Sequence, residues 1–274
     1  MGDQREDESG SEEEFLARYK GQEYPKPSVT VDVVIFSILD GELKVLLIQR
    51  KAHPYRGCWA IPGGFVDVGN AYLDQGEDLD AAAHRELEEE TSLPRGSCFL
   101  EQLYTFGKAG RDPRTRVITV AYYALVRPTL APLVHPQSDA QKARWFSVWK
   151  LWEKGHLEGT PDVVKPLIES EGLGSLGNAS LAFDHPDILT QAIRRIRGKI
   201  DYAPIAFDLV PERFTVSDLR SVFEVVKGTM YHAGNFQRRF QRMLEDGTIV
   251  PADGETTRRA GGRPARLYRF VRPA

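Results

Sequence analysis

The chain has 274 residues, 41% of them hydrophobic, and a formal net charge of −3. This length favours two domains, and the apolar content excludes a chain that is disordered throughout. The two cysteines, Cys58 and Cys98, form no disulfide framework or zinc-site pattern, so we expect reduced thiols in a cytoplasmic protein. No signal segment and no apolar run of membrane-spanning length is found, and we expect no membrane partner.

Charge is distributed unevenly along the chain. Residues 1–14 hold seven acidic residues and one arginine, a balance of −6, whereas residues 212–274 hold twelve Arg/Lys and seven Asp/Glu, a balance of +5. Like charges at this density repel one another, so residues 1–22 are predicted to form a disordered acidic tail. The basic C-terminal part is a candidate for binding nucleic acid.

The first half of the chain predicts strands around one helix. The dipeptide Asp40-Gly41 is a hairpin signal between the first two strands. Strands are expected at 29–38, 43–50, 98–106, 116–126 and 143–151. The segment 59–66 is expected to be a short strand that continues into a loop rich in glycine and proline. A helix is expected at 77–93, with its inward-facing residues being Leu79, Ala81, Ala82 and Leu87. The segment 152–183 is glycine-rich and has no pattern that places it.

An amphipathic helix is predicted at 185–200. Its basic residues lie off the apolar stripe, which consists of Ile188, Ala192, Ile196 and Ile200. We interpret this helix as a connector between two domains.

The C-terminal part predicts two helices followed by a hairpin. Thr215 or Ser217 is the candidate N-cap of a helix at 214–226, whose apolar stripe is Leu219, Val222, Phe223 and Val226. A second helix at 235–247 places Phe236, Phe240 and Met243 on one side and Asn235, Arg238 and Arg242 on the other. Two helices joined by a glycine-containing turn and followed by a hairpin predict a winged helix-turn-helix.

The helix at 77–93 concentrates negative charge in the segment "HRELEEETS". Glu86, Glu89 and Glu90 project to one side of a helix, which is how one helix can present carboxylates to Mg²⁺. The alternative is a solvated acidic face, and the spacing alone leaves both interpretations open.

The surrounding sequence favours the metal site by resemblance. "GGFVDVGNAYLDQGEDLDAAAHRELEEETSL" resembles the Nudix box, in which Glu77 is followed by seven residues, then Arg85-Glu86-Leu87, one residue, and Glu89-Glu90. The resemblance implies a Nudix fold, a mixed sheet with flanking helices, and hydrolysis of nucleoside diphosphate derivatives with Mg²⁺ or Mn²⁺. It implies metal ligands at Glu86, Glu89 and Glu90, a bracing pair of Glu77 and Arg85, and catalytic roles for Glu77, Arg85 and Glu89.

Two departures from the box bear on catalysis. Twelve residues separate Gly64 from Glu77 where the pattern has five, which indicates an insertion at "NAYLDQG". Ser92 stands where the pattern has glycine, at a helix end that often needs a positive φ angle. Neither departure removes a carboxylate.

Residues before the box are the candidate ligand contacts. Arg50 stands where this family places basic residues near the pyrophosphate, although it is also interpretable as a surface arginine at a strand end. The candidate ligand-binding residues are Arg50, Gly63, Gly64 and Phe65, with Phe65 alternatively packing in the loop. The tract "GKAGRDPRTR" carries Arg111, Arg114 and Arg116, either on a solvated turn or reaching a phosphate pocket.

The second C-terminal helix and the wing supply the candidate DNA contacts. Arginine and asparagine pair bidentately with guanine and adenine edges, and a wing arginine can enter a groove. The candidates are Asn235, Gln237, Arg238, Arg239, Arg242, Arg258, Arg259, Arg263 and Arg266. The alternative is a basic winged helix used only for protein contacts.

The two parts together resemble the Nudix-related transcriptional regulators, through "LAFDHPDIL", "YAPIAFDLVPERFTVSDLR", "NFQRRF" and "GGRPARLYRF". The resemblance implies a homodimeric bacterial repressor of NAD-metabolism or related genes that binds an operator duplex and senses ADP-ribose or a similar nucleotide. The alternative is a Mg²⁺-dependent hydrolase of ADP-ribose, and one protein can be both. We expect an α+β chain divided into an acidic tail, a Nudix domain, a linker helix and a winged helix, at 1–22, 23–183, 184–204 and 205–274.

Overall fold

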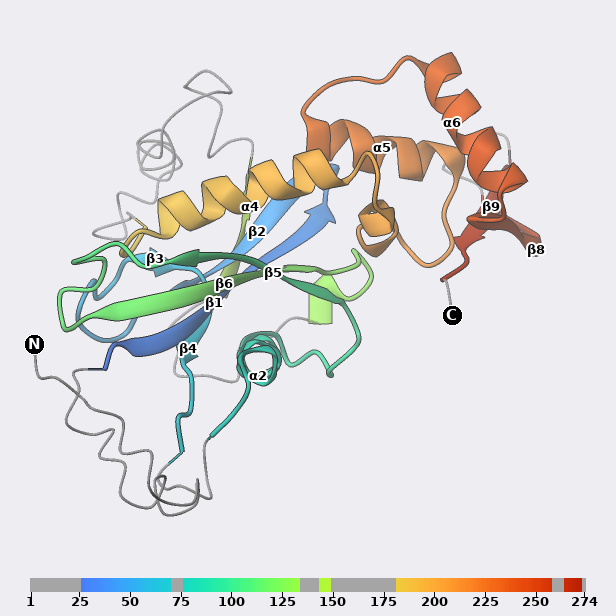
Figure 1. Ribbon diagram of the computed structural model, residues 1–274. Helices are drawn as coiled ribbons and strands as arrows, with labels where there is room; N and C mark the ends of the chain where they lie inside the picture. The colour runs from blue at the N-terminus through green and yellow to red at the C-terminus, as the bar shows by residue number, and fades with distance from the viewer. Residues whose placement is uncertain (1–25, 70–75, 134–142, 149–180, 258–263, 273–274) are drawn as a thin grey trace, which may run out of the picture.

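The computed structural model describes residues 26–69, 76–133, 143–148, 181–257 and 264–272 (Figure 1). The acidic tail, most of the glycine-rich segment and the tip of the wing therefore lie outside the described residues. Both cysteines lie within them and form no disulfide, with Cys58 buried and Cys98 partly buried. No helix in the described part of the chain is long and apolar enough to cross a membrane.

A mixed sheet forms the centre of the N-terminal domain, with the order β3-β2-β1-β6-β5 and with β4 paired to β1 and β7 to β2. Strand β1 runs parallel to β6 and antiparallel to β2, and Asp40 and Gly41 between β1 and β2 both have positive φ angles, as the hairpin signal predicts. The strands are β1 (Ser28–Leu39), β2 (Glu42–Gln49), β3 (Trp59–Ala60), β4 (Gly63–Phe65), β5 (Phe99–Phe106), β6 (Val117–Leu125) and β7 (Ala143–Ser147).

One helix covers each face of this sheet (Figure 1). Side chains alternate along β1, so Val33 and Ile35 pack with α2 (Leu79–Thr91), whereas Val34 and Phe36 belong to the cluster that contains α4 (His185–Lys199). Burial on both faces explains why the sequence of β1 is almost continuously apolar.

The inward face of α2 differs from the prediction at its first turn. Ala82 and Leu87 are buried as predicted, but Ala81 is only partly buried, Ala83 is buried in its place, and Leu79 is 37% exposed. Helical side chains tilt toward the helix N-terminus, and Leu79 is the first residue of α2, so its side chain projects beyond the helix start. The prediction that Leu79 faces inward is therefore wrong, and the buried face includes Ala83 rather than Ala81.

Helix α4 lies across the sheet with its predicted apolar stripe fully buried. It ends at Lys199, earlier than the segment 184–204 that the sequence assigns to the linker. Ala203 is extended because it precedes Pro204, and a residue before proline disfavours helical backbone angles.

The C-terminal part forms the predicted winged helix. Thr215 is the N-cap of the first helix: its hydroxyl accepts a hydrogen bond from the Asp218 backbone N–H, and the Asp218 carboxylate accepts one from the Thr215 backbone N–H, which selects Thr215 over Ser217. Gly228 ends that helix with a φ angle of 67°. The elements are η5 (Pro204–Asp208), α5 (Val216–Lys227), α6 (Ala233–Glu245), β8 (Ile249–Thr257) and β9 (Ala265–Phe270), the last two being antiparallel.

Candidate functional site

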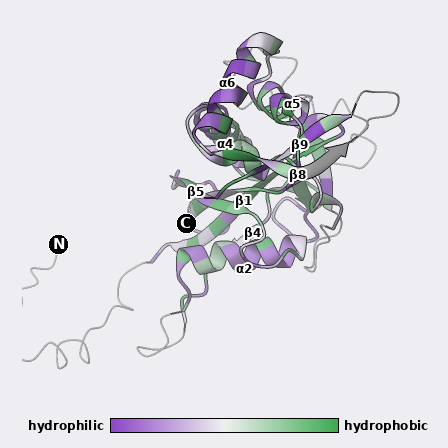
Figure 2. Ribbon diagram, turned by 90° about the vertical axis from the view of Figure 1, so that its right-hand side faces the viewer, coloured by the Kyte–Doolittle hydropathy of each residue, from purple (hydrophilic) through white to green (hydrophobic). Residues whose placement is uncertain are grey.

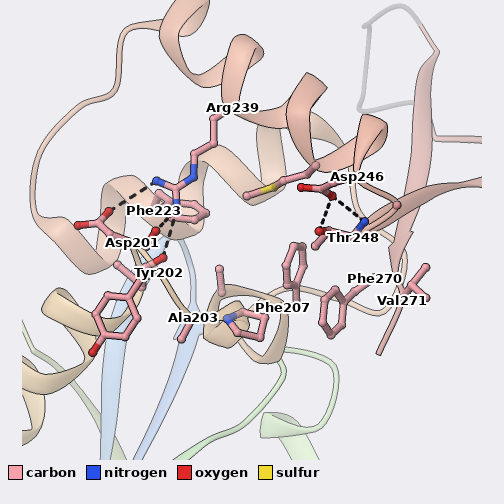
Figure 3. Close-up of a pocket in the computed structure, with 15 residues that line it drawn as sticks. Asp201, Tyr202, Ala203, Phe207, Phe223, Arg239, Asp246, Thr248, Phe270 and Val271 are labelled. Atoms are coloured by element: carbon pink, nitrogen blue, oxygen red, sulfur yellow. Dashed lines mark hydrogen bonds and ion pairs between the residues drawn. The ribbon is translucent and has the colours of Figure 1, made fainter. Parts of the chain in front are cut away.

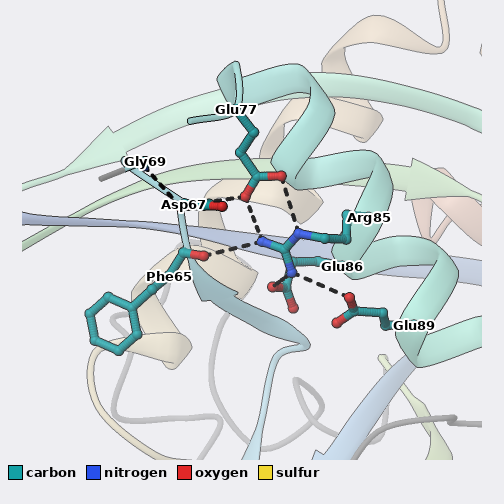
Figure 4. A network of polar contacts seen from close by, with 7 residues as sticks. All are labelled: Phe65, Asp67, Gly69, Glu77, Arg85, Glu86 and Glu89. Carbon is teal, nitrogen blue, oxygen red and sulfur yellow. Dashed lines mark hydrogen bonds and ion pairs between the residues drawn. The ribbon is translucent and has the colours of Figure 1, made fainter. Parts of the chain in front are cut away.

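The Glu77–Arg85 pair joins the loop after β4 to helix α2 (Figure 4). Arg85 donates from Nε and Nη2 to the two carboxylate oxygens of Glu77 at 3.1 and 2.7 Å, and from Nη2 to the backbone oxygen of Phe65 at 3.1 Å. The hydrogen bonds from Arg85 lower the pKa of Glu77. Glu77 also accepts the backbone N–H of Asp67 at 3.0 Å. The bracing pair implied by the Nudix box is therefore present.

The three box carboxylates differ in exposure. Glu86 and Glu90 are buried, whereas the Glu89 side chain is 47% exposed. Arg85 Nη1 donates to Glu86 Oε1 at 2.7 Å and to Glu89 Oε1 at 3.4 Å. Burial raises the pKa of Glu86, although the Arg85 contact opposes this shift. A Cβ atom on Gly64 would collide with the Glu86 carboxylate, so any other residue at position 64 would displace this carboxylate.

These carboxylates suit a hard cation in their chemistry. All are oxygen donors on one side of α2, and two of them are buried beside each other, where a divalent ion would offset their repulsion. In the described residues, however, no three His, Cys, Asp or Glu side chains converge as a metal site, and Arg85 bridges Glu86 and Glu89. Metal binding by Glu86, Glu89 and Glu90 stays a prediction.

The helix end after the carboxylates has the conformation that the box requires. Ser92 is left-handed, with φ 59° and ψ 13°, and its backbone N–H donates to the Glu88 carbonyl at 2.7 Å. Serine thus occupies the glycine position without changing the course of the chain, at some conformational cost.

A cavity of about 150 Å³ lies at β4 and the start of α4, and all four candidate ligand residues line it. Gly63 and Gly64 form one wall. Arg50 donates from Nε to the Pro54 carbonyl at 2.9 Å, and its pKa is lowered by burial and by the charge of Arg114. The cavity therefore brings together Arg50, Gly63, Gly64 and Phe65, but their contact with a ligand stays a prediction.

The loop between β5 and β6 adds two arginines to the same cavity. Arg114 lies over the Phe65 ring, 5.4 Å from its centroid, and donates to the carboxylate of Asp112 at 3.0 and 2.7 Å. Arg111 also lines the cavity, whereas Arg116 does not. Of the two alternatives for this tract, the structure favours the one in which it reaches a pocket.

A buried charged cluster at the base of the cavity was not predicted. Arg111 donates from Nε and Nη2 to the carboxylate of Asp184 at 2.9 and 2.6 Å and lies 3.6 Å from Asp32. His185 accepts the backbone N–H of Ile61 at Nδ1, at 2.8 Å, and burial lowers its pKa. One signal was available: Asp32 interrupts an otherwise apolar strand, and a buried aspartate needs a partner.

The outer face of α6 presents the polar residues expected of a recognition helix. Asn235, Gln237, Arg238 and Arg242 are exposed, Arg238 donates to the Asn235 side chain at 2.6 Å, and Figure 2 shows α6 coloured mainly as hydrophilic. An open groove along α6 is lined by Asn235, Arg238, Gln241, Arg242 and Glu245. Arg266 is exposed on β9, and Arg258, Arg259 and Arg263 lie outside the described residues.

Arg239 does not share this outer face (Figure 3). Its Nη2 donates to the backbone carbonyl of Asp201 at 3.0 Å, its Nη1 lies 3.6 Å from the Asp201 carboxylate, and its guanidinium lies 4.2 Å from the centroid of the Phe223 ring. These contacts hold Arg239 against α5 and the end of α4, away from the face that Arg238 and Arg242 share, and its contact with DNA stays a prediction.

Comparison with known proteins agrees with both parts of the structure. Residues 29–166 match the family described as the NUDIX domain, and residues 206–270 match the NrtR DNA-binding winged helix domain. The chain is 35% identical over 261 residues to the ADPR responsive transcriptional repressor NtrR of Acinetobacter baylyi, covering 95% of this chain and 89% of that protein.

One further relative matches a single domain, and one solved structure matches both domains. The ADP-ribose pyrophosphatase of Methanocaldococcus jannaschii is 33% identical over 126 residues, which cover 46% of this chain and 64% of that protein. The crystal structure of Shewanella oneidensis NrtR complexed with a 27mer DNA has a TM-score of 0.65 and 28% identity, covering 89% of this chain and 93% of that one.

The fold and the braced carboxylate helix thus define a Nudix-domain protein that carries a C-terminal winged helix. Nudix domains generally use divalent metal ions. Because the similarity extends through both domains and nearly the whole chain, the protein belongs to the Nudix-related transcriptional regulator family.

Proposed function

We propose that this protein is a DNA-binding transcriptional repressor whose Nudix domain senses ADP-ribose. The observation that carries the proposal is the exposed face of α6, where Asn235, Arg238 and Arg242 stand on the second helix of a winged helix-turn-helix. Residues of these types read base edges in the major groove. The wing arginines Arg258, Arg259, Arg263 and Arg266 would add backbone or minor-groove contacts.

The protein is expected to act as a homodimer in the cytoplasm. One winged helix reads a short half-site, and two recognition helices related by a twofold axis read a near-palindromic operator. We place its target genes in NAD metabolism, as the family resemblance implies. In the division into an acidic tail, a Nudix domain, a linker and a winged helix, sensing of ADP-ribose belongs to residues 23–183 and binding to DNA belongs to residues 205–274.

The cavity in the Nudix domain suits the diphosphate of ADP-ribose. Arg50 and Arg114 lie within it as bidentate donors, and Gly63 and Gly64 let a ligand approach the backbone. Phe65 is 48% exposed beside the cavity and has a ring face available to a base or sugar. The name of the Acinetobacter relative, an ADPR responsive repressor, supports the same ligand.

Binding to DNA is testable with a duplex selected from a random-sequence library by the parent protein. Fluorescence anisotropy should show salt-sensitive binding that Arg238→Ala or Arg242→Ala weakens by about 1–3 kcal/mol. Arg116→Ala is the matched control, because it removes an exposed arginine from the Nudix domain. Equal affinities for the α6 variants and the control would contradict this assignment of the DNA-binding face.

A second function, hydrolysis of ADP-ribose, is favoured by the intact Glu77–Arg85 brace and the retained carboxylates. Glu86, Glu89 and Glu90 would hold Mg²⁺ or Mn²⁺, which supplies charge neutralisation and a more acidic water in such reactions. Glu77 and Arg85 would fix the loop against the helix, and Glu89 is the most exposed of the three carboxylates to solvent. AMP release from ADP-ribose with Mg²⁺, abolished by Glu89→Gln, would establish this activity, and no release would leave a sensor.

A further inference from the structure

We propose that Arg111 and Asp184 form an exchangeable ion pair through which an anionic ligand in the Nudix cavity shifts helix α4 and thereby the recognition helix α6. This rests on the proposed function, because it assigns the residues that connect the ligand cavity to the DNA-binding face. Three features carry it: the charge balance of the cavity, the strained start of α4 and the contacts at its far end.

The charges around the cavity are already balanced. Among the described residues, three arginines face three aspartates that line the cavity or pair with a lining residue: Arg50, Arg111 and Arg114 with Asp32, Asp112 and Asp184. A diphosphate entering this balanced set adds negative charge and competes with the aspartates for the arginines that they bind.

Asp184 is the aspartate whose release from its arginine affects the other domain. Asp112 belongs to the same loop as Arg114, two positions away, so an exchange there stays local. Asp184 lies 73 positions from Arg111 in the sequence and is the N-cap residue of α4. An exchange at Arg111 therefore frees one end of a helix that reaches the other domain.

The start of α4 is held in a conformation that can relax. Phe183 has a φ angle of 52°, which is sparsely populated by residues other than glycine. Its ring contacts the guanidinium of Arg50 at 4.8 Å and the ring of Tyr55 at 4.7 Å. Asp184 makes no side-chain capping bond, because its carboxylate binds Arg111 instead. Once released, this carboxylate lies at a helix N-terminus, where negative charge is stabilised.

Helix α4 can carry a displacement as a rigid body. Its 15 residues span about 22 Å, and the stripe of Ile188, Ala192 and Ile196 is fully buried against the sheet. A packed interface of this kind shifts between discrete arrangements rather than deforming continuously.

Asp201, just after α4, connects this helix to both α5 and α6, and Figure 3 shows its contact with Arg239 of α6. Its carboxylate accepts from Lys227 Nζ of α5 at 2.6 Å and lies 3.6 Å from Arg239 of α6, which also binds the Asp201 carbonyl. Arg197 donates to the Lys227 carbonyl at 3.1 Å. A displacement of α4 therefore moves α6, which carries Arg238 and Arg242.

The test compares the full-length parent with Asp184→Asn, which keeps the shape of the side chain and removes its charge. Affinity for the selected duplex is measured with and without saturating ADP-ribose. If the ligand changes the parent affinity within the common range of about 5- to 150-fold, Asp184→Asn alone should already have the liganded affinity and respond by less than about twofold. Asp187→Asn is the matched control, since it removes the same charge from the first turn of the same helix and should keep the parent response.

Three other outcomes would contradict the proposed exchange of the ion pair between Arg111 and Asp184. A full ligand response in Asp184→Asn, equal to that of Asp187→Asn, would show that Arg111 and Asp184 do not transmit occupancy. If circular dichroism shows that Asp184→Asn is unfolded, Arg111→Lys, which keeps the charge but loses the bidentate geometry, must show the reduced response instead. A parent that binds the duplex but ignores ADP-ribose would overturn the proposed sensing function and the exchange with it, whereas absence of duplex binding would overturn DNA binding itself.

Discussion

Replacing Glu77 by glutamine tests the brace that shapes the Nudix site. Two hydrogen bonds of 3.1 and 2.7 Å join the Glu77 carboxylate to Arg85. Charged hydrogen bonds contribute about 1.5–3 kcal/mol each when they are buried. The Arg85 side chain is 36% exposed, so solvent screens the pair, and glutamine can still accept one bond. We expect Glu77→Gln to lower the free energy of unfolding by about 1–2 kcal/mol.

Arg85→Ala should cost more than Glu77→Gln, because Arg85 has further partners. Arg85 also donates to Glu86, which is buried, and to the Phe65 carbonyl. A buried carboxylate left without its donor costs about 1–3 kcal/mol in addition. The expected loss in free energy of unfolding is therefore about 2–5 kcal/mol for Arg85→Ala.

Urea unfolding of the parent, both single variants and the double variant gives the coupling energy of the pair. Tryptophan fluorescence is a suitable signal, because Trp59 is buried in the sheet. Isothermal titration with ADP-ribose on the same proteins shows whether the loop that carries Phe65 still binds ligand. A coupling energy near zero, or a larger loss for Glu77→Gln than for Arg85→Ala, would refute this account of the brace.

Three further predictions concern single positions. Ser92→Gly should raise the free energy of unfolding by about 0.5–1 kcal/mol, measured by urea unfolding, because glycine adopts the left-handed conformation more readily. Gly64→Ala should weaken ADP-ribose binding in isothermal titration, because its Cβ would displace the Glu86 carboxylate; unchanged affinity would contradict this. Burial raises the pKa of Asp208, although Arg272 opposes this shift. The folded protein therefore holds the proton of this carboxyl more tightly than the unfolded chain does. The resulting stabilisation is present below the unfolded pKa and is lost as pH rises through the folded pKa. Asp208→Asn should therefore become more stable relative to the parent as pH increases from acid to neutral, and parallel pH–stability curves would argue otherwise.

Features that depend on local sequence were predictable. The turn at Asp40-Gly41, the apolar stripe of α4 and the cap at Thr215 each arise from interactions within a few residues. The Glu77–Arg85 pair was also predictable, because the Nudix box fixes its spacing in sequence. Leu79 follows the same periodicity, but its exposure depends on where the helix begins, and helix boundaries are weakly encoded.

Features that depend on distant contacts were not predictable. Arg111 and Asp184 come from different elements, and only the packing of α4 on the sheet brings them together. Arg239 stands at the margin of the polar face of α6, where the helical pattern leaves its direction open. The Phe223 ring and the carbonyl groups at the end of α4 decide that direction.

The hydrophobic core explains how a change in one domain can reach the other. A single buried cluster extends from the sheet residues Phe36 and Trp59, through Ile196 of α4, to Phe223 and Phe240 of the winged helix. Domains joined by a flexible tether reorient freely, and a ligand in one then has little influence on the other. Here the shared core makes reorientation of the winged helix costly unless α4 moves with it. In the proposed control by a ligand, the displaced contact lies at the N-terminal end of α4, where Arg111 binds Asp184.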